Sequence, residues 1–134
     1  MSVPKSQRGD SEVEFIYAAR RLELYTIRKC ISMPKRYTFY LSQPLANDAK
    51  RIHDDVKMAN SIFPMNAHEA QVRRDYLMRA NAELYAMISQ LEITQEIVGI
   101  DGRVMGYWAE LIAREIRLIR AVMKRDQERF SKLE

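Results

Sequence analysis

The stretch from Asn66 to Val98 constrains the fold of this chain more than any other part of the sequence. Asn66 can cap a helix through its side chain, and Glu69, three residues later, can complete a capping box. Gly99 follows at the position where a left-handed C-terminal cap is favoured. The pattern therefore predicts one helix of about 45 to 50 Å, at about 1.5 Å per residue.

This predicted helix is apolar on two opposite faces. The residues of each face recur at three- and four-residue steps, and Arg79 and Glu83 are the only charges between Leu77 and Leu91. A helix that is apolar nearly all round is a buried helix, and a chain this short cannot surround one with its own material. We therefore expect one face to meet the protein's own core and the other to meet a second subunit. The expected core face comprises Leu77, Ala80, Leu84, Met87, Leu91 and Val98, and the expected interface face comprises Met78, Ala82, Ala86, Ser89 and Ile93.

The composition indicates a single all-α domain. With 134 residues, of which 47% are hydrophobic, the chain can form one compact domain with its own core. Good helix formers dominate, and glycine and proline are few. No apolar run approaches the roughly 18 to 20 residues of a membrane-spanning helix, and the N-terminus lacks the apolar core of a signal peptide. We therefore expect a cytoplasmic protein with no membrane segment, and the single cysteine, Cys30, agrees with a reducing compartment.

Three further helices are predicted, at residues 11–31, 34–62 and 101–125. Pro44 lies inside the second of these and is expected to kink it, not to split off a short leading segment, because the apolar register continues across the proline. Short connections make successive helices antiparallel, which predicts an up-down-up-down four-helix bundle. The predicted organisation is a flexible basic arm at residues 1–10, the bundle at residues 11–125 and a polar tail at residues 126–134.

The last predicted helix has two apolar stripes. Trp108, the only tryptophan in the chain, lies on the inner stripe and is expected to be buried. Leu111 and Leu118 lie on the second stripe and are predicted at the subunit interface. Glu115 falls between the stripes, where we expect it to pair with an arginine across the bundle.

Several short motifs resemble those of one known family. The motifs are MSVPKSQRG at the start of the chain, PKRY at residues 34–37, Met58-Ala59-Asn60, and Gly102-Arg103 followed by Tyr107-Trp108. Over nearly the whole chain they resemble the four-helix-bundle accessory variability determinant (Avd) proteins of diversity-generating retroelements, and equally the related bundles encoded in ribosomal RNA intervening sequences. The resemblance implies a basic ring, typically a homopentamer, that binds a reverse transcriptase and RNA or DNA and has no active site. Pro44 departs from the family's pattern.

Basic residues are expected to gather at one end of the bundle. The end of the first helix and the start of the second meet there, which predicts a phosphate-binding cluster. Tyr37, Phe39 and Tyr40 follow directly and can stack on unpaired bases, although they can equally pack into the core beneath solvated charges. The predicted cluster comprises Arg28, Lys29, Lys35 and Arg36, with Arg103 near by. Arg73, Arg74, Arg114, Arg117 and Lys124 are predicted as further nucleic-acid contacts, with Glu69 and Asp75 as alternative partners of the first two.

The sequence predicts no catalytic residue, metal site, cofactor or small-molecule substrate. His68-Glu69 lacks the second histidine of a zinc-protease motif, because position 72 is Val72. Cys30 lies on an apolar side, where it is expected to be a small core residue. Three functions remain open at this stage: a nucleic-acid-binding subunit of a reverse transcriptase complex, a structural homo-oligomeric adaptor, and a small helical enzyme that uses Glu115.

Overall fold

The computed structural model describes the backbone of residues 5–134 and the side chains of residues 13–134. Within that part of the chain the protein is helical and has no strand. The long helices are α1 (Lys5–Ser32), α2 (Gln43–Ser61), α3 (Ala67–Val98) and α4 (Gly102–Phe130), with a 3-10 turn η1 (Lys35–Tyr37) and a π-helical turn η2 (Thr38–Ser42) before α2. The predicted all-α class with four long helices is confirmed.

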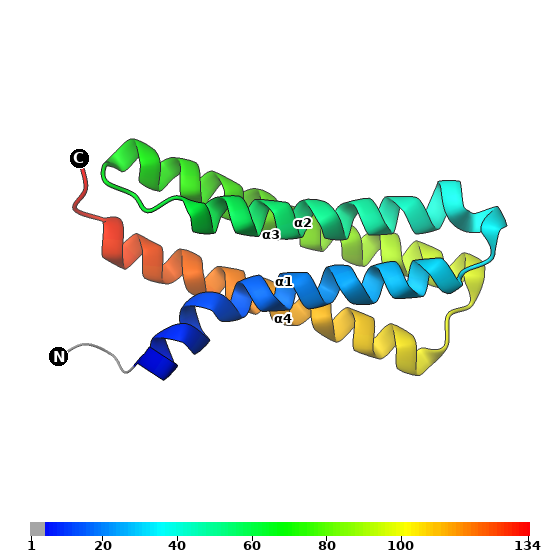
Figure 1. The fold of residues 1–134 in the computed structure, drawn as a ribbon. Helices are drawn as coiled ribbons and strands as arrows, with labels where there is room; N and C mark the ends of the chain where they lie inside the picture. The colour runs from blue at the N-terminus through cyan, green and yellow to red at the C-terminus, as the bar shows by residue number, and fades with distance from the viewer. Residues whose placement is uncertain (1–4) are drawn as a thin grey trace.

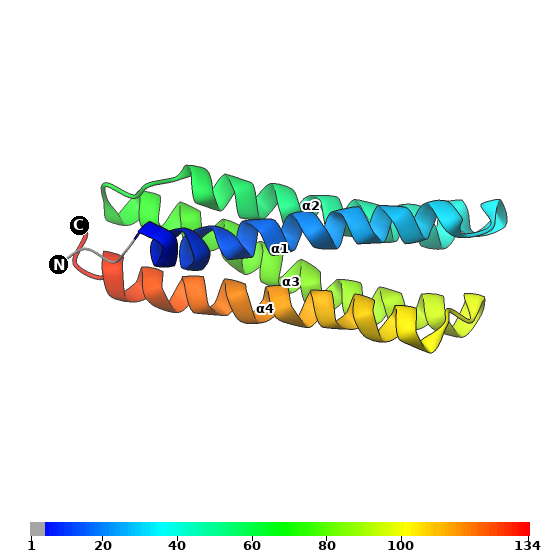
Figure 2. The ribbon, with the colours of Figure 1, turned by 60° about the horizontal axis from the view of Figure 1, so that its bottom comes forward.

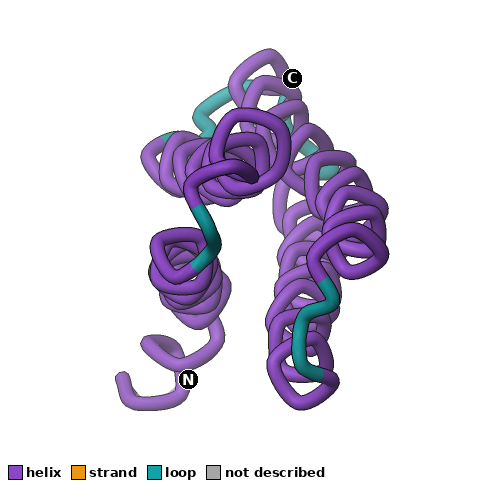
Figure 3. Tube along the Cα trace, turned by 90° about the vertical axis from the view of Figure 1, so that its right-hand side faces the viewer, coloured by secondary structure: helices purple, strands orange, loops and turns teal. Residues whose placement is uncertain are grey.

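The helices lie lengthwise beside one another as a bundle (Figures 1 and 2). Each packs on its neighbour in the chain, and α1 also packs on α4. Figure 3 shows this arrangement from the end at which η1 and η2 lie. The connections from α1 to α2 and from α3 to α4 are at this end, whereas the C-terminus and the connection from α2 to α3 are at the other end (Figure 1).

Local capping explains why α3 begins and ends where the sequence predicts. The Asn66 carboxamide oxygen accepts a hydrogen bond from the Glu69 backbone N–H at 2.8 Å, and the Glu69 carboxylate accepts one from the Met65 N–H at 2.7 Å. Gly99 ends the helix with φ of 76°, a left-handed conformation that glycine adopts without a steric penalty. At the start of α4, the Asp101 carboxylate caps the helix by accepting a hydrogen bond from the Arg103 N–H at 2.9 Å.

The core forms from one face of each helix. The predicted core residues of α3 from Leu77 to Leu91 are buried, whereas Val98 is half-buried. Trp108 is fully buried, as predicted, and its indole N–H donates to the Thr26 hydroxyl at 2.9 Å. Leu111 was predicted at a subunit interface, and this is wrong: it is 6% exposed and belongs to the chain's own core. Val104, Leu118 and Val122 of the same stripe also pack in or against this core.

The predicted course of the chain before α2 is wrong. Residues 35–42 form η1 and η2, so a short leading segment precedes α2 where one kinked α-helix was expected. Pro44 lies in the first turn of α2, directly after η2, a position at which proline is tolerated in a helix. Phe63 lies beyond the end of α2 at Ser61 and is 77% exposed.

Both ends of the predicted bundle also differ from the structure. Helix α1 begins at Lys5, six residues before the expected start at Ser11, so only residues 1–4 of the predicted arm are outside the described residues. Gly9 costs a helix only about 1 kcal/mol and does not stop it. Helix α4 continues to Phe130, so most of the predicted polar tail is helical. Asp126, in this last part of α4, is 9% exposed and forms an ion pair with Arg73 of α3.

Candidate nucleic-acid interface

Five of the predicted cations lie at the end of the bundle where α1 leads into η1 and where α4 begins (Figure 1). We call this group the basic end. Among the described residues, none of them has a carboxylate within ion-pairing distance, and all except the half-buried Lys29 are exposed. The basic end comprises Arg28 and Lys29 of α1, Lys35 and Arg36 of η1, and Arg103 of α4.

The two turns before α2 determine what the basic end exposes. Pro34 has the extended φ and ψ of −56° and 144°, which ends the helical path of α1 and starts η1. The Arg36 guanidinium lies 4.6 Å from the centre of the Tyr37 ring and donates to its hydroxyl at 3.1 Å. Phe39 and Tyr40 are each 74% exposed, with ring centres 5.1 Å apart. These two rings therefore do not pack into the core, and their predicted stacking on bases stays a prediction.

Arg73 is a structural residue, and its predicted contact with nucleic acid is wrong. Its side chain is 7% exposed, and its guanidinium donates to the Asp126 carboxylate at 2.6 and 3.3 Å. The same guanidinium donates to the backbone carbonyls of Ala59 and Ile62 at 3.0 and 3.3 Å. Four donated hydrogen bonds inside the protein leave this cation unavailable to an external phosphate.

The remaining predicted cations do not join the basic end. Arg74 and Lys124 lie toward the opposite end of the bundle, roughly 30 to 35 Å away by the rise of α3 and α4. Arg114 pairs with Glu14 of α1, and Arg117 pairs with Glu110 at 2.8 Å on an exposed part of α4. The ten predicted contacts therefore do not form one surface.

Three acidic side chains of α2 and α3 are paired or partly protonated within the protein. Lys50 pairs with Asp54 at 2.6 Å, and the Arg79 guanidinium donates to both oxygens of the buried Asp55. Burial, together with the neighbouring Asp55, raises the pKa of Glu83 to about 7, so this carboxyl is partly protonated near neutral pH.

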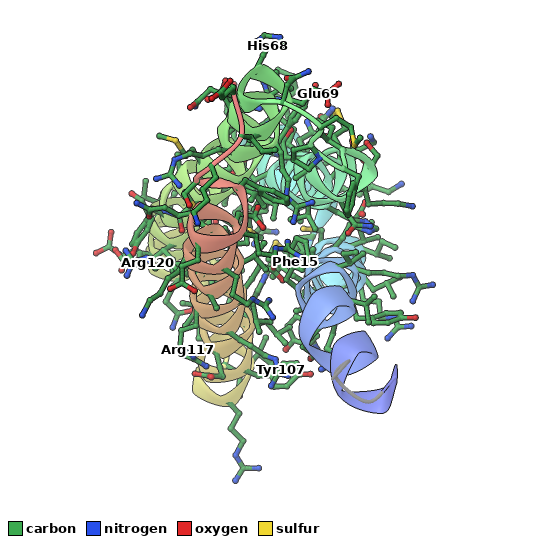
Figure 4. The ribbon with its side chains drawn as sticks, turned by 90° about the vertical axis from the view of Figure 1, so that its left-hand side faces the viewer. Phe15, His68, Glu69, Tyr107, Arg117 and Arg120 are labelled. Carbon is green, nitrogen blue, oxygen red and sulfur yellow. The ribbon has the colours of Figure 1, made fainter. Side chains whose placement is uncertain are left out.

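Sequence reasoning missed a groove between α1 and α4. The groove has a volume of about 430 Å³ and includes Arg28, which also belongs to the basic end. Figure 4 shows Tyr107 on the side of α4 toward α1, and Arg120 on the side away from it. The recurrence of aromatic and basic residues at three- and four-residue steps along α1 is the signal that identifies this face. The groove is lined by Glu14, Tyr17, Arg20, Arg21, Leu24, Tyr25, Arg28 and Tyr107.

The predicted interface face of α3 points outward. Met78 is 49% exposed and Ile93 is 45% exposed, and Ala82 and Ala86 between them are exposed too. Tyr85 and Ile97 are exposed as well and extend this apolar face along the helix beyond the predicted residues. Leu118 of α4 is half-buried and packs against the core. The outward orientation of the α3 face agrees with the prediction, while oligomerisation itself stays a prediction.

Glu115 does not form the ion pair that the sequence predicts. It is fully buried, and neither carboxylate oxygen has a hydrogen-bond partner among the described residues. Burial, and secondarily the charge of Glu14, raises the pKa of Glu115 to about 9, although Arg114 lowers it in part. Glu115 is therefore protonated at neutral pH.

Cys30 and His53 have partners within the protein. The Cys30 thiol donates to the Ser42 carbonyl at 3.2 Å, and burial raises its pKa to about 11. His53 Nδ1 lies 2.7 Å from a carboxylate oxygen of Glu23. Within the described residues, no group of three or more histidine, cysteine or acidic side chains is arranged to hold a metal ion.

Comparison of the chain with known protein families, with curated proteins and with solved structures gives no match. The family resemblance therefore rests on the short motifs of the sequence. No helix of the described residues is long and apolar enough to cross a membrane. The positions of the cations and of the exposed apolar face are the structural observations on which a function can be based.

Proposed function

We propose that this protein is a non-catalytic accessory subunit of a diversity-generating retroelement, acting in the cytoplasm as a basic homo-oligomer that binds a reverse transcriptase and its template RNA or cDNA. The main support is the basic end, where exposed cations gather without carboxylate partners among the described residues. Such cations bind phosphates and release the condensed counterions of a nucleic acid. The Avd-like motifs of the sequence supply the reverse transcriptase as the partner.

Oligomerisation makes this basic end more effective. A single set of five cations gives weak affinity, because phosphate contacts position a chain without reading its bases. When each subunit of a ring presents the same set to one nucleic acid, the contacts act together at a raised effective concentration. A ring therefore converts a modest basic surface into a useful binding site.

The exposed face of α3 is the proposed contact between subunits. It presents Met78, Ala82, Ala86 and Ile93 in helical register, where a second copy of the bundle can cover them. We propose that the helices of each subunit form an antiparallel four-helix bundle. We also propose that the subunits meet through this α3 face in a pentameric ring. Burial of apolar side chains along several turns of a helix is a suitable driving force for such an assembly.

Binding of a labelled RNA hairpin by the full-length chain tests the nucleic-acid role. At about 50 mM salt, where phosphate contacts are strong, the assembly should bind the hairpin. Light scattering on the same sample should show an oligomer. If the oligomer forms but binds no nucleic acid at this salt concentration, the protein is a structural adaptor, which the α3 face alone supports.

The reverse transcriptase is tested separately, through the genes that flank this one. A neighbouring reverse transcriptase gene, whose product co-purifies with this protein, is the expected result. Location of the gene inside a ribosomal RNA intervening sequence would instead place the protein in the second group that its motifs resemble. That result would contradict the retroelement part of the proposal.

A further inference from the structure

The groove between α1 and α4 combines exposed tyrosines with arginines. Tyr17 is 60% exposed on α1, and Tyr107 is 49% exposed on α4. Arg20, Arg21 and Arg28 line the same groove. Groups of this kind, flat aromatic faces between guanidinium groups, are used by proteins that bind unpaired nucleic-acid strands.

The charge of the groove is basic. Its one acidic lining residue, Glu14, is held in an ion pair by Arg114 of α4. Among the described residues, Arg20, Arg21 and Arg28 have no ion-pair partner. The groove therefore offers three arginines to an anionic ligand, and its single carboxylate is already compensated.

Tyr107 is held in place by Tyr25, which itself packs on the core. The ring of Tyr25 meets that of Tyr107 edge to face at 4.8 Å, and it meets the buried ring of Trp108 in the same manner at 5.8 Å. Trp108 is itself fixed by its hydrogen bond to Thr26. Burial and the neighbouring Tyr107 raise the pKa of Tyr25, so its hydroxyl stays uncharged beside a phosphate. This part of the groove is thus preorganised, so less side-chain entropy is lost when a ligand binds.

We propose that this groove binds an unpaired nucleic-acid strand, with bases stacked on Tyr17 and Tyr107 and phosphates contacted by Arg20 and Arg28. A duplex keeps its base faces inside the stack, so only an unpaired strand can use the tyrosine rings. Arg28 belongs both to the groove and to the basic end, so one strand can continue from one to the other. The inference rests on the proposed function and deepens it, because it specifies unpaired strands as the ligand of this groove.

An abasic strand separates stacking from charge. We suggest measuring the affinity of the full-length assembly for a fluorescein-labelled oligothymidylate of about 12 nucleotides, which can cover several stacking positions. An abasic strand of equal length has the same phosphates but no bases. The parent should bind oligothymidylate about tenfold or more tightly than the abasic strand, since each stacked base contributes measurably to affinity.

Substitution of the tyrosines locates the stacking. Tyr17→Ala and Tyr107→Ala should each weaken oligothymidylate binding by about fivefold or more, and should leave binding of the abasic strand nearly unchanged. Both side chains are about half-exposed or more, so their removal spares the core. Phe63→Ala is the matched control, because it removes an exposed aromatic ring at the opposite end of the bundle.

Trp108 provides a second readout. It is the only tryptophan in the chain and contacts Tyr25 beneath the groove, so binding of oligothymidylate should change its fluorescence. Equal affinity for oligothymidylate and the abasic strand, or equal effects of Tyr107→Ala and Phe63→Ala, would overturn the inference while the proposed function survives. Failure of the assembly to bind the abasic strand, oligothymidylate and an RNA hairpin alike at low salt would overturn both.

Discussion

Arg73 and Asp126, which are 53 positions apart in the sequence, form a buried ion pair that joins the beginning of α3 to the end of α4. The pair is bidentate, and the guanidinium also holds the carbonyls that end α2. Arg129 adds a further contact to the Asp126 carboxylate at 2.7 Å. Three helices are therefore fastened together at the end of the bundle opposite the basic end.

Removal of Asp126 should be strongly destabilising. Asp126→Ala leaves the buried Arg73 without its carboxylate, so the free energy of unfolding should fall by about 3 to 5 kcal/mol in urea titrations. The double variant Arg73→Met with Asp126→Leu should recover most of this loss, because it removes both charges and retains volume. Asp54→Ala, which breaks an exposed pair, is the control and should have a much smaller effect. A loss below about 1 kcal/mol for Asp126→Ala would contradict the structural role of the pair.

Glu115 should make the protein less stable as pH rises. Its folded pKa of about 9 exceeds its ordinary value of 4.5, so between these pH values the folded state retains a proton that the unfolded state has released. Stability due to this group is thus complete below about pH 4.5 and declines toward pH 9. The glutamine of the Glu115→Gln variant is neutral at every pH. The free energy of unfolding of this variant should therefore rise relative to that of the parent as pH increases, by on the order of 3 kcal/mol near pH 7. Urea titrations at several pH values measure the difference, and a gain that does not vary with pH would contradict this account.

Ala86→Arg should separate the subunits. A charge at the centre of the α3 face would be buried without a partner in the assembly, at a cost of several kcal/mol. Light scattering should therefore show a smaller species, while circular dichroism shows unchanged helix content. Ala121→Arg adds the same charge to an exposed position of α4 and should leave the assembly intact. If the assembly formed by the Ala86→Arg variant has the same molar mass as the parent assembly, α3 is not the contact between subunits.

Cys30 should react slowly with alkylating reagents in the folded protein. The thiolate is the reactive form, and a rise in the pKa from 9.0 to about 11 reduces its population about a hundredfold at pH 8. Mass spectrometry should show that iodoacetamide modifies the denatured chain far faster than the folded one. Equal rates would mean that the thiol is neither buried nor engaged with Ser42.

The sequence predicts well those features that local chemistry determines. Helix α3 begins and ends where Asn66 and Gly99 indicate, because its caps involve residues within a few positions of one another. The burial of Trp108 follows from its helical register, which adjacent residues define. The outward direction of Met78 follows from the same periodicity. These features depend on spacing along one helix and on no other part of the chain.

Features that depend on contacts between helices were missed. In the sequence, Arg73 looks like a surface cation, because its partner Asp126 is far away along the chain. Only the fold brings the two side chains together. Leu111 resembles an interface residue until the packed helices bury it in the chain's own core. The groove forms only when Tyr107 of α4 meets Tyr25 of α1. Periodicity shows which residues share a face, but it does not show what that face meets.

The salt dependence of RNA binding tests the central claim most directly. Between about 50 and 200 mM salt, the affinity of the parent for a labelled RNA hairpin should fall by about a hundredfold or more. The double variant Lys35→Ala with Arg36→Ala should bind more weakly and with a shallower salt slope, because it lacks two phosphate contacts per subunit. Lys57→Ala with Lys132→Ala removes two exposed cations away from the basic end and should retain the parent's slope. An affinity that does not depend on salt, or a Lys35 and Arg36 double variant that binds as tightly as the parent, would contradict the assignment of the basic end as the nucleic-acid surface.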